Sequence, residues 1–152
     1  MLSVTIKVIG TEKARETFRR LGVSISNFSK ELKTTGEYLV GFIKGPVFET
    51  EGQVYGGAWR SLNPGYQAWK QTNYPGRGTL ELTGTMRKSF QAQSSQMFLR
   101  VFNPTPYFIK HQLGRDRMPQ RVMMRIDEAR KQEIVKIIHK GLVERVRKAR
   151  GV

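Results

Sequence analysis

The chain has 152 residues, a size typical of one domain, and 38% of them are hydrophobic and 26% charged. Its 27 Lys and Arg against 12 Asp and Glu give a formal charge of +15, so we expect an anionic macromolecule or an acidic surface nearby. The sequence has no apolar run long enough to span a membrane, no signal-peptide pattern at its start, and no cysteine for disulfides, thiolate nucleophiles or Cys-based metal sites.

The first quarter of the chain predicts a strand followed by helix. Val4, Ile6 and Val8 alternate with polar residues, which is typical of a half-buried strand. From residue 11 to about 44, apolar residues recur in steps of three and four, which predicts one helix or a pair of helices divided at Gly22. We expect this apolar stripe to pack on the sheet of the same domain; the alternative is a coiled-coil contact between subunits.

The middle of the chain combines glycine-rich and aromatic segments. Residues 45–57 lack periodicity and predict a long loop, which in a small domain is usually functional or ordered by a partner. A short helix is predicted from Pro64, since proline suits the first turn, and a turn at residues 74–78 follows it. Another short helix is predicted from about Leu80 to Lys88.

The remainder of the chain predicts a strand at 97–102, one or two helical turns at 106–113, a strand from Val122 to Ile126 and a final helix at 127–150 capped by Asp127. We therefore expect a single α+β domain over residues 1–152. Its small mixed or antiparallel sheet would pack against the N-terminal helix or helix pair and the C-terminal helix.

The final helix is strongly basic. Basic residues near a helix C-terminus are favoured by the helix dipole, but here they extend well beyond the last turn. A solvated face and a face for nucleic acid or another partner are both open interpretations. The basic residues are Arg130, Lys131, Lys136, Lys140, Arg145, Arg147, Lys148 and Arg150.

The sequence offers little for catalysis. His111 and His139 lie far apart and lack metal-ligand spacing, although Asp116 could orient His111. No glycine-rich phosphate-binding motif is present, so we predict no metal, no cofactor and no enzymatic activity. Aromatic and basic residues mingle between residues 59 and 77, as on a surface that stacks single-stranded nucleic acid, but burial of most of these aromatics is the commoner outcome.

Three stretches together resemble the virion-morphogenesis family of tailed phages, the Mu G-like tail-completion proteins. They are residues 57–62 with Tyr66 and Lys70, residues 80–89, and residues 106–121. The sequence departs from the family pattern at Met86, where leucine is expected, and in the three residues between Tyr107 and His111. The resemblance covers about half of the chain, roughly residues 45–125.

The resemblance implies a non-enzymatic virion protein, made in the cytoplasm of the bacterial host. Copies would form a ring, expected to be a hexamer, at the head-proximal end of the tail, where it helps the tail join the filled head. We expect Trp59 and Tyr107 to fill the core, Gly84 and Gly114 to permit tight turns, and Pro119 to stiffen the entry to the next strand. The motif residues with an expected scaffold role are Trp59, Lys70, Gly84, Tyr107, His111, Gln112, Gly114, Pro119 and Arg121.

Contacts in such an assembly are expected in two regions. The loop at 45–57 and the turn at 74–78 supply candidate contacts between subunits or with neighbouring neck and tail proteins: Phe48, Glu51, Tyr55, Tyr74 and Arg77. The final helix supplies candidate contacts to DNA in the lumen, without sequence specificity, or to an acidic partner: Lys140, Arg145, Arg147 and Lys148. The alternatives are a basic DNA-binding module and, with the least support, a hydrolase that uses His111.

Overall fold

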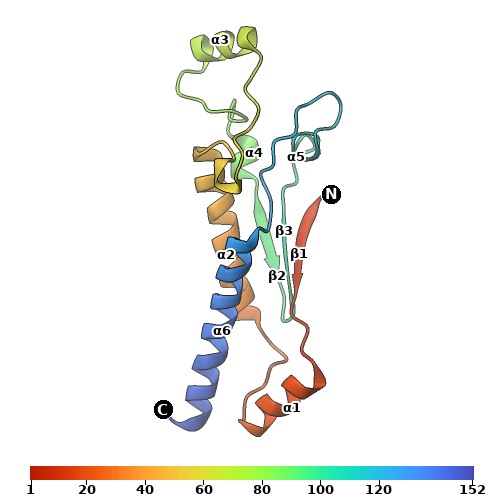
Figure 1. Ribbon diagram of the computed structural model, residues 1–152, viewed down its shortest axis with the longest axis vertical. Helices are drawn as coiled ribbons and strands as arrows, with labels where there is room; N and C mark the ends of the chain where they lie inside the picture. The colour runs from red at the N-terminus through yellow and green to blue at the C-terminus, as the bar shows by residue number, and fades with distance from the viewer. The chain divides into compact units, whose positions relative to one another are not determined.

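A computed structural model describes all residues, 1–152. It has the expected α+β composition, with a small three-stranded antiparallel sheet and a long C-terminal helix (Figure 1). The elements in chain order are β1 (Ser3–Lys7), α1 (Glu12–Arg20), α2 (Ser29–Phe42), the π-helix η1 (Ile43–Val47), the 3-10 helix η2 (Gln53–Tyr55), α3 (Pro64–Asn73), α4 (Thr85–Lys88), β2 (Gln91–Ser94), β3 (Phe98–Phe102), α5 (Phe108–Leu113) and α6 (Glu128–Arg150).

The chain folds into two compact units, each assembled from three stretches. Unit 1 comprises residues 1–4, 40–91 and 102–125, and unit 2 comprises residues 5–39, 92–101 and 126–152. Whether the whole chain behaves as one domain, as expected from its length, stays a prediction. None of the helices combines the length and apolarity that crossing a membrane requires.

The sheet has the strand order β1-β3-β2, and most of its residues belong to unit 2. The predictions of β1 and β3 are confirmed, each within a residue or so at its ends. Strand β2 was missed, because its sequence Gln-Ala-Gln-Ser is fully exposed and carries no apolar alternation. Helix α2 packs on this sheet: a Cβ added at Gly36 would lie 2.9 Å from Ala92 and 3.0 Å from Leu99.

The segment after β1 forms two separate helices, α1 and α2, which is one of the two arrangements that the sequence predicted. Thr11 caps α1 by accepting a hydrogen bond from the Ala14 amide at 3.2 Å, and Gly22 follows the helix with a φ of 71°. The buried apolar residues of α2 then join the core of this unit, which contains Val23, Phe28, Leu32, Leu39, Leu99 and Val101.

The C-terminal helix α6 begins where Asp127 predicts it, since the Asp127 carboxylate accepts from the Arg130 amide at 2.9 Å. Its apolar face is half-buried, and none of its residues is fully buried. It packs closely against α2 at Gly141, where an added Cβ would lie only 2.2 Å from the Glu31 carboxylate. Arg145 forms an ion pair with the same carboxylate at 2.5 Å.

Unit 1 has an aromatic core. The Phe48 ring makes edge contacts with Trp59 and Phe90, and Phe90 makes an edge contact with Phe108, at centroid separations of 5.3 to 6.3 Å. All four rings are at most 7% exposed. The interior of unit 1 is therefore filled by aromatic rings that lie far apart in the sequence, from Phe48 to Phe108.

Residues 45–57 are not the irregular loop that the sequence predicted. Helix α2 continues directly into η1 and a further helical turn, and η2 follows after a tight turn at Gly52, whose φ is 84°. Pro46 lies inside η1 and has no amide to donate, which favours the wider π-helical turn over a regular α-helix. The glycines in this segment separate short helical turns and do not indicate an extended loop.

Candidate functional site

The three motif stretches converge in unit 1 around a cavity of about 470 Å³, here called the motif cavity. Side chains from α3, from the segment before α4, and from α5 and the turn after it form its walls. Tyr66, Tyr107 and Met118 lie at its exposed rim, each about 40% accessible. The lining residues are Leu62, Tyr66, Lys70, Leu80, Leu82, Thr83, Thr85, Met86, Tyr107, His111, Met118 and Arg121.

Lys70 is a buried lysine that ties α3 to the turn after it. Only 3% of the residue is exposed, and its ammonium group donates a hydrogen bond to the Gly78 carbonyl oxygen. Burial lowers the pKa of Lys70 below its usual range, whereas the nearby carboxylates of Glu81 and Glu51 act to raise it. The expected scaffold role of Lys70 therefore has a physical basis.

Arg121 holds the segment that precedes α3. Its guanidinium donates to the Arg60 carbonyl oxygen at 2.8 and 3.1 Å, and more weakly to that of Ser61 at 3.4 Å. Burial lowers the pKa of Arg121, while Glu51 acts to raise it. Because the side chain is only 4% exposed and its bonds go to backbone oxygens, it serves the architecture of the cavity wall.

Gln112 replaces a strand partner for residues 122–126. Its side-chain oxygen accepts from the amides of Met123 and Met124 at 2.8 and 3.1 Å, and its nitrogen donates to the Met124 carbonyl at 2.8 Å. The prediction of a strand here is wrong, because side chains, chiefly that of Gln112, satisfy backbone groups that a neighbouring strand would otherwise pair.

Two motif glycines adopt the left-handed conformation that their roles require. Gly84 precedes α4 with a φ of 75°, and Gly114 ends α5 with a φ of 67°. At Gly114 an added Cβ would also lie 3.1 Å from the Gln120 backbone nitrogen. Pro119 is half-buried immediately before this contact, but the strand that it was expected to introduce is not formed.

The two aromatic residues expected in the core behave differently. Trp59 is 7% exposed and packs against Phe48, which confirms the prediction. Tyr107 is 40% exposed at the rim of the motif cavity, so its prediction as a core residue is wrong. The Phe108 ring beside it enters the core instead, because the helical turn at the start of α5 points the two side chains apart.

His111 lies in the cavity wall without the carboxylate partner that acid–base catalysis would require. Asp116, which could have oriented it, is exposed and forms an ion pair with Lys110 at 2.9 Å. The Nδ1 atom of His111 is buried and has no hydrogen-bond partner. Burial and the neighbouring positive charge of Arg121 lower the pKa of His111 below its ordinary value of 6.5, which favours a neutral ring.

No cluster of three or more His, Asp or Glu side chains in the structure could hold a metal ion. The cavity instead combines apolar walls with basic side chains whose hydrogen bonds are made to the backbone. Such a site can receive an apolar group from another molecule.

Of the candidate subunit contacts, the structure leaves two on the surface. Phe48 is 2% exposed, so it is a core residue and its prediction as a contact is wrong. Glu51 accepts from the Thr79 amide at 2.7 Å, and the Tyr55 hydroxyl donates to the Met123 carbonyl at 3.4 Å, so both serve unit 1 internally. Tyr74 and Arg77 are exposed and remain candidates.

Sequence analysis missed a surface formed by Tyr66, Trp69 and Tyr74, here called the α3 aromatic cluster. The rings of Tyr66 and Trp69 stack with centroids 5.5 Å apart, and Tyr74 lies 5.7 Å from Trp69. The three residues are 39 to 46% exposed, contrary to the expectation that most of these aromatics are buried. Their spacing on a short polar helix with no other apolar face was the available signal.

Arg87 lies in the second motif stretch, residues 80–89, but was not among the predicted site residues. Its Nε donates to the Lys44 carbonyl oxygen, and its two terminal nitrogens pair with Glu81 at 2.8 Å and Glu49 at 3.4 Å. Its guanidinium also lies over the Phe48 ring, 5.6 Å from the centroid. Arg87 therefore joins α4 to η1.

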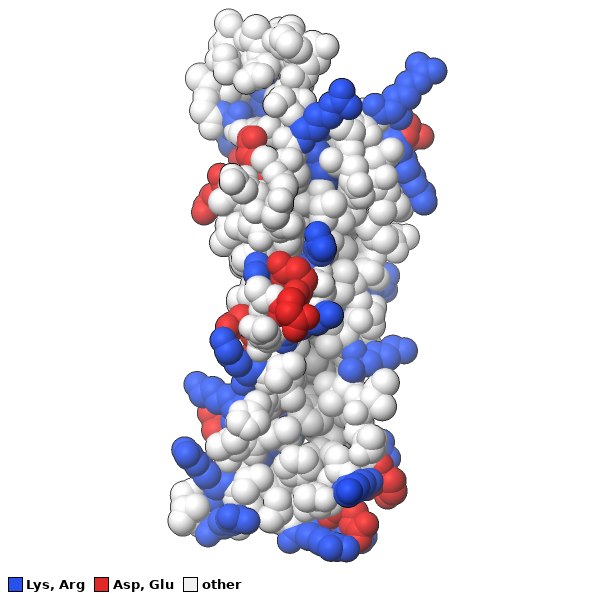
Figure 2. Space-filling view, in the orientation of Figure 1, with Lys and Arg blue, Asp and Glu red and all other residues white.

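The basic residues of α6 are unequally available. Lys140, Arg147 and Lys148 are exposed, whereas Arg145 is engaged by Glu31 and by the Phe28 ring, 5.0 Å from its guanidinium. Lys and Arg side chains project from much of the face shown in Figure 2. Lys140, Arg147 and Lys148 therefore remain candidate contacts for an anionic partner, whereas Arg145 also holds the Glu31 carboxylate.

The family comparison extends well beyond the motif stretches. The model of the phage virion morphogenesis family matches residues 9–143, most of the chain. Comparison with curated proteins and with solved structures found no match. The family match therefore covers most of both compact units, most of α6 and the whole motif cavity.

Proposed function

The chain belongs to the phage virion morphogenesis family, and from this premise we propose that it is a tail-completion subunit that joins the tail to the head. Membership of this family indicates a structural role in the virion, not a catalytic one. In the proposal, copies form a ring at the head-proximal end of the tail, and neighbouring neck and tail proteins contact that ring.

The α3 aromatic cluster is the observation that supports self-assembly. Helix α3 contains a single charged residue, Lys70, which is buried, so the exposed surface of the helix is uncharged. Tyr and Trp are enriched, and charged residues depleted, at the centres of protein interfaces. On a chain with a formal charge of +15, such a surface is suited to contact between proteins.

Self-repulsion explains why an uncharged surface matters. Like-charged copies repel each other, and this repulsion is smallest where the contacting faces carry no charge. We propose a hexamer, in which six copies would carry a formal charge of about +90. DNA in the lumen or acidic neighbouring proteins would offset that charge, with Lys140, Arg147 and Lys148 available for the contact.

The experiment is measurement of molar mass by size-exclusion chromatography with light scattering over a range of salt concentrations. We expect a ring that salt stabilises, since screening reduces the repulsion between copies. Trp69→Gln is expected to reduce the ring to smaller species. The matched control is Phe98→Gln, which removes another exposed aromatic ring, 44% accessible, from strand β3 and is expected to leave the mass unchanged.

The alternative, a basic DNA-binding module, is tested by the same molar-mass measurement together with a mobility-shift assay on duplex DNA. A wild-type chain that stays monomeric at all salt concentrations and shifts duplex DNA at low protein concentration would overturn the ring. The uncharged surface of α3 speaks against the Tyr66–Arg77 region as a phosphate-binding face, because non-specific DNA binding depends on Lys and Arg contacts to phosphate.

A further inference from the structure

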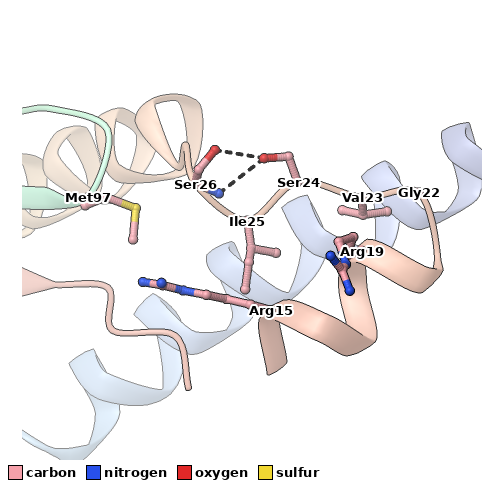
Figure 3. A pocket seen from close by; sticks show the side chains of 8 residues that line it. All are labelled: Arg15, Arg19, Gly22, Val23, Ser24, Ile25, Ser26 and Met97. Carbon is pink, nitrogen blue, oxygen red and sulfur yellow. Dashed lines mark hydrogen bonds between the residues drawn. The ribbon is translucent and has the colours of Figure 1, made fainter. Parts of the chain in front are cut away.

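A second cavity, of about 600 Å³, lies within unit 2 between α1 and the segment that follows it (Figure 3). Its position is separate from the family motif residues, all of which belong to unit 1. We call it the arginine pocket. It is lined by Arg15, Arg19, Gly22, Val23, Ser24, Ile25, Ser26 and Met97.

The shape of the arginine pocket is fixed by backbone hydrogen bonds. The Val23 amide donates to the Phe18 carbonyl at 2.8 Å, which turns the chain back along α1 after Gly22. Further along, the Phe28 amide donates to the Gln96 carbonyl at 2.7 Å and holds the other end of the segment beside the β2–β3 turn. The pocket is therefore formed before any ligand arrives.

The floor of the arginine pocket is apolar. Val23 is 5% exposed, and the half-buried side chains of Ile25 and Met97 complete the surface. The hydroxyls of Ser24 and Ser26 are hydrogen-bonded to each other at 2.8 Å, as Figure 3 shows. This floor can bury an apolar side chain of a ligand.

The rim of the arginine pocket carries unpaired positive charge. Arg15 and Arg19 are one helical turn apart on α1, a spacing at which like charges repel. No ion pair or side-chain hydrogen bond engages either guanidinium, whereas Arg20 on the same helix pairs with Glu16 at 2.5 Å. No Asp or Glu lines the pocket.

A neighbouring hollow adds to the positive charge. It shares Gly22, Val23 and Ser24 with the arginine pocket and is also lined by Arg145, Lys148 and Ala149. Lys148 is exposed and forms no ion pair. The two hollows together give an apolar strip with basic side chains on both sides of the Gly22–Ser24 segment.

We propose that the arginine pocket binds an acidic peptide segment of a different protein, a segment in which carboxylates flank an apolar side chain. The guanidinium groups of Arg15 and Arg19 match the geometry of carboxylates and would form charge-assisted hydrogen bonds with them. The apolar side chain would cover Val23, Ile25 and Met97. This binding is a separate activity from ring formation and requires only one copy of the chain.

The chemistry of the pocket favours an acidic peptide over the other anions. A nucleic-acid backbone supplies phosphates for the two arginines but no apolar side chain that could cover Val23, Ile25 and Met97. A second copy of this chain would bring a further formal charge of +15 to an already basic rim. An acidic partner complements both the charge and the floor.

The test is fluorescence anisotropy of the full-length protein with a labelled pool of nine-residue peptides, in which Asp or Glu alternates with Leu or Phe. Measurements at near-physiological salt, about 0.15 M, screen exposed charges from one another. Two matched pools replace either the apolar residues with Ser or the acidic residues with Lys. Unlabelled duplex DNA is added as a competitor.

We expect only the acidic–apolar pool to bind. The double variant R15Q/R19Q should weaken this binding by about tenfold or more, since it removes both charged donors. The matched variant K13Q/R20Q removes two charges from the same helix outside the pocket and should change binding by about twofold or less. Ile25→Ser, which alters the floor and leaves the charge unchanged, should weaken binding by about threefold to tenfold.

Four results would overturn the proposal: no binding of the acidic–apolar pool, equal binding of the acidic–serine pool, displacement of the bound peptide by duplex DNA at comparable concentration, or equal losses in R15Q/R19Q and K13Q/R20Q. Arg15 and Arg19 are exposed, so their variants should keep the wild-type circular dichroism spectrum and melting temperature. The molar mass of wild-type protein, measured alongside, separates this outcome from failure of the ring.

Discussion

The indole Nε1 of Trp59 donates a hydrogen bond to the carbonyl oxygen of Val122 at 2.9 Å. This bond joins the chain after η2 to the segment that Gln112 also holds. Gly52 makes room for the indole: a Cβ at this position would lie 2.3 Å from Nε1. One buried aromatic residue therefore connects the first motif stretch to the segment that directly follows the third.

Trp59→Phe is expected to destabilise the protein by about 1–3 kcal/mol, because the Val122 carbonyl loses its donor while most of the ring packing against Phe48 is kept. Urea unfolding followed by circular dichroism measures this loss. An unchanged midpoint would mean that water satisfies the carbonyl equally well.

Gln112→Leu is expected to cost more, about 3 kcal/mol or above, since two amides and one carbonyl lose their partner together. Gln120→Leu serves as the control, because Gln120 is exposed and donates one long hydrogen bond of 3.3 Å. The same unfolding experiment compares the two, and similar losses would contradict the role assigned to Gln112.

His111 is expected to make stability fall as the solution is acidified. Its pKa is lowered in the folded protein, so the unfolded chain takes up a proton first as the pH falls through 6.5, and this favours unfolding. The penalty is absent above that pH and is complete below the folded pKa. Melting temperatures between pH 7.5 and 5.5 should therefore drop less in His111→Gln than in wild type.

The control for this pH dependence is His139→Gln, which removes the other histidine from an exposed position on α6. Its melting temperature should follow the wild-type curve. A His111→Gln curve parallel to wild type would show that carboxylates or other groups dominate the acid response.

Two helical glycines should respond oppositely to alanine. Gly141→Ala places a methyl group against the buried Glu31 side chain, which Arg145 holds in place, and is expected to cost about 1–3 kcal/mol. Gly41→Ala has no atom within 4 Å of the new Cβ and should stabilise α2 by roughly 0.5–1 kcal/mol. Thermal unfolding of the two variants checks the sign of each change.

Local signals in the sequence predicted most of the helices and two of the three strands. The cap at Asp127, the proline at α3 and the break at Gly22 act within a few residues, so the chain itself reveals them. The strand predicted from Val122 to Ile126 failed for the opposite reason. Its alternating pattern is real, but its backbone bonds to the side chains of Gln112, Trp59 and Tyr55, and no local pattern records those partners.

The candidate site was predicted in part. The motif led to Lys70, Gln112 and Arg121, all of which prove to bind backbone groups of neighbouring loops. Phe48 was misplaced because its segment was read as a loop, whereas η1 turns the ring into the core. The α3 aromatic cluster escaped prediction since exposure depends on what the rest of unit 1 fails to cover.

Each compact unit is built from three separated stretches of the chain, so neither can be completed until its last stretch has been synthesised. Unit 1 lacks its third stretch until residues 102–125 have been synthesised, and unit 2 lacks α6 until residues 128–150 have been synthesised. Arg145, the partner of the buried Glu31 carboxylate, emerges more than a hundred residues after Glu31 itself. Until α6 has been synthesised, Glu31 therefore lacks both its ion-pair partner and the helix that covers it, and unit 2 cannot complete its core.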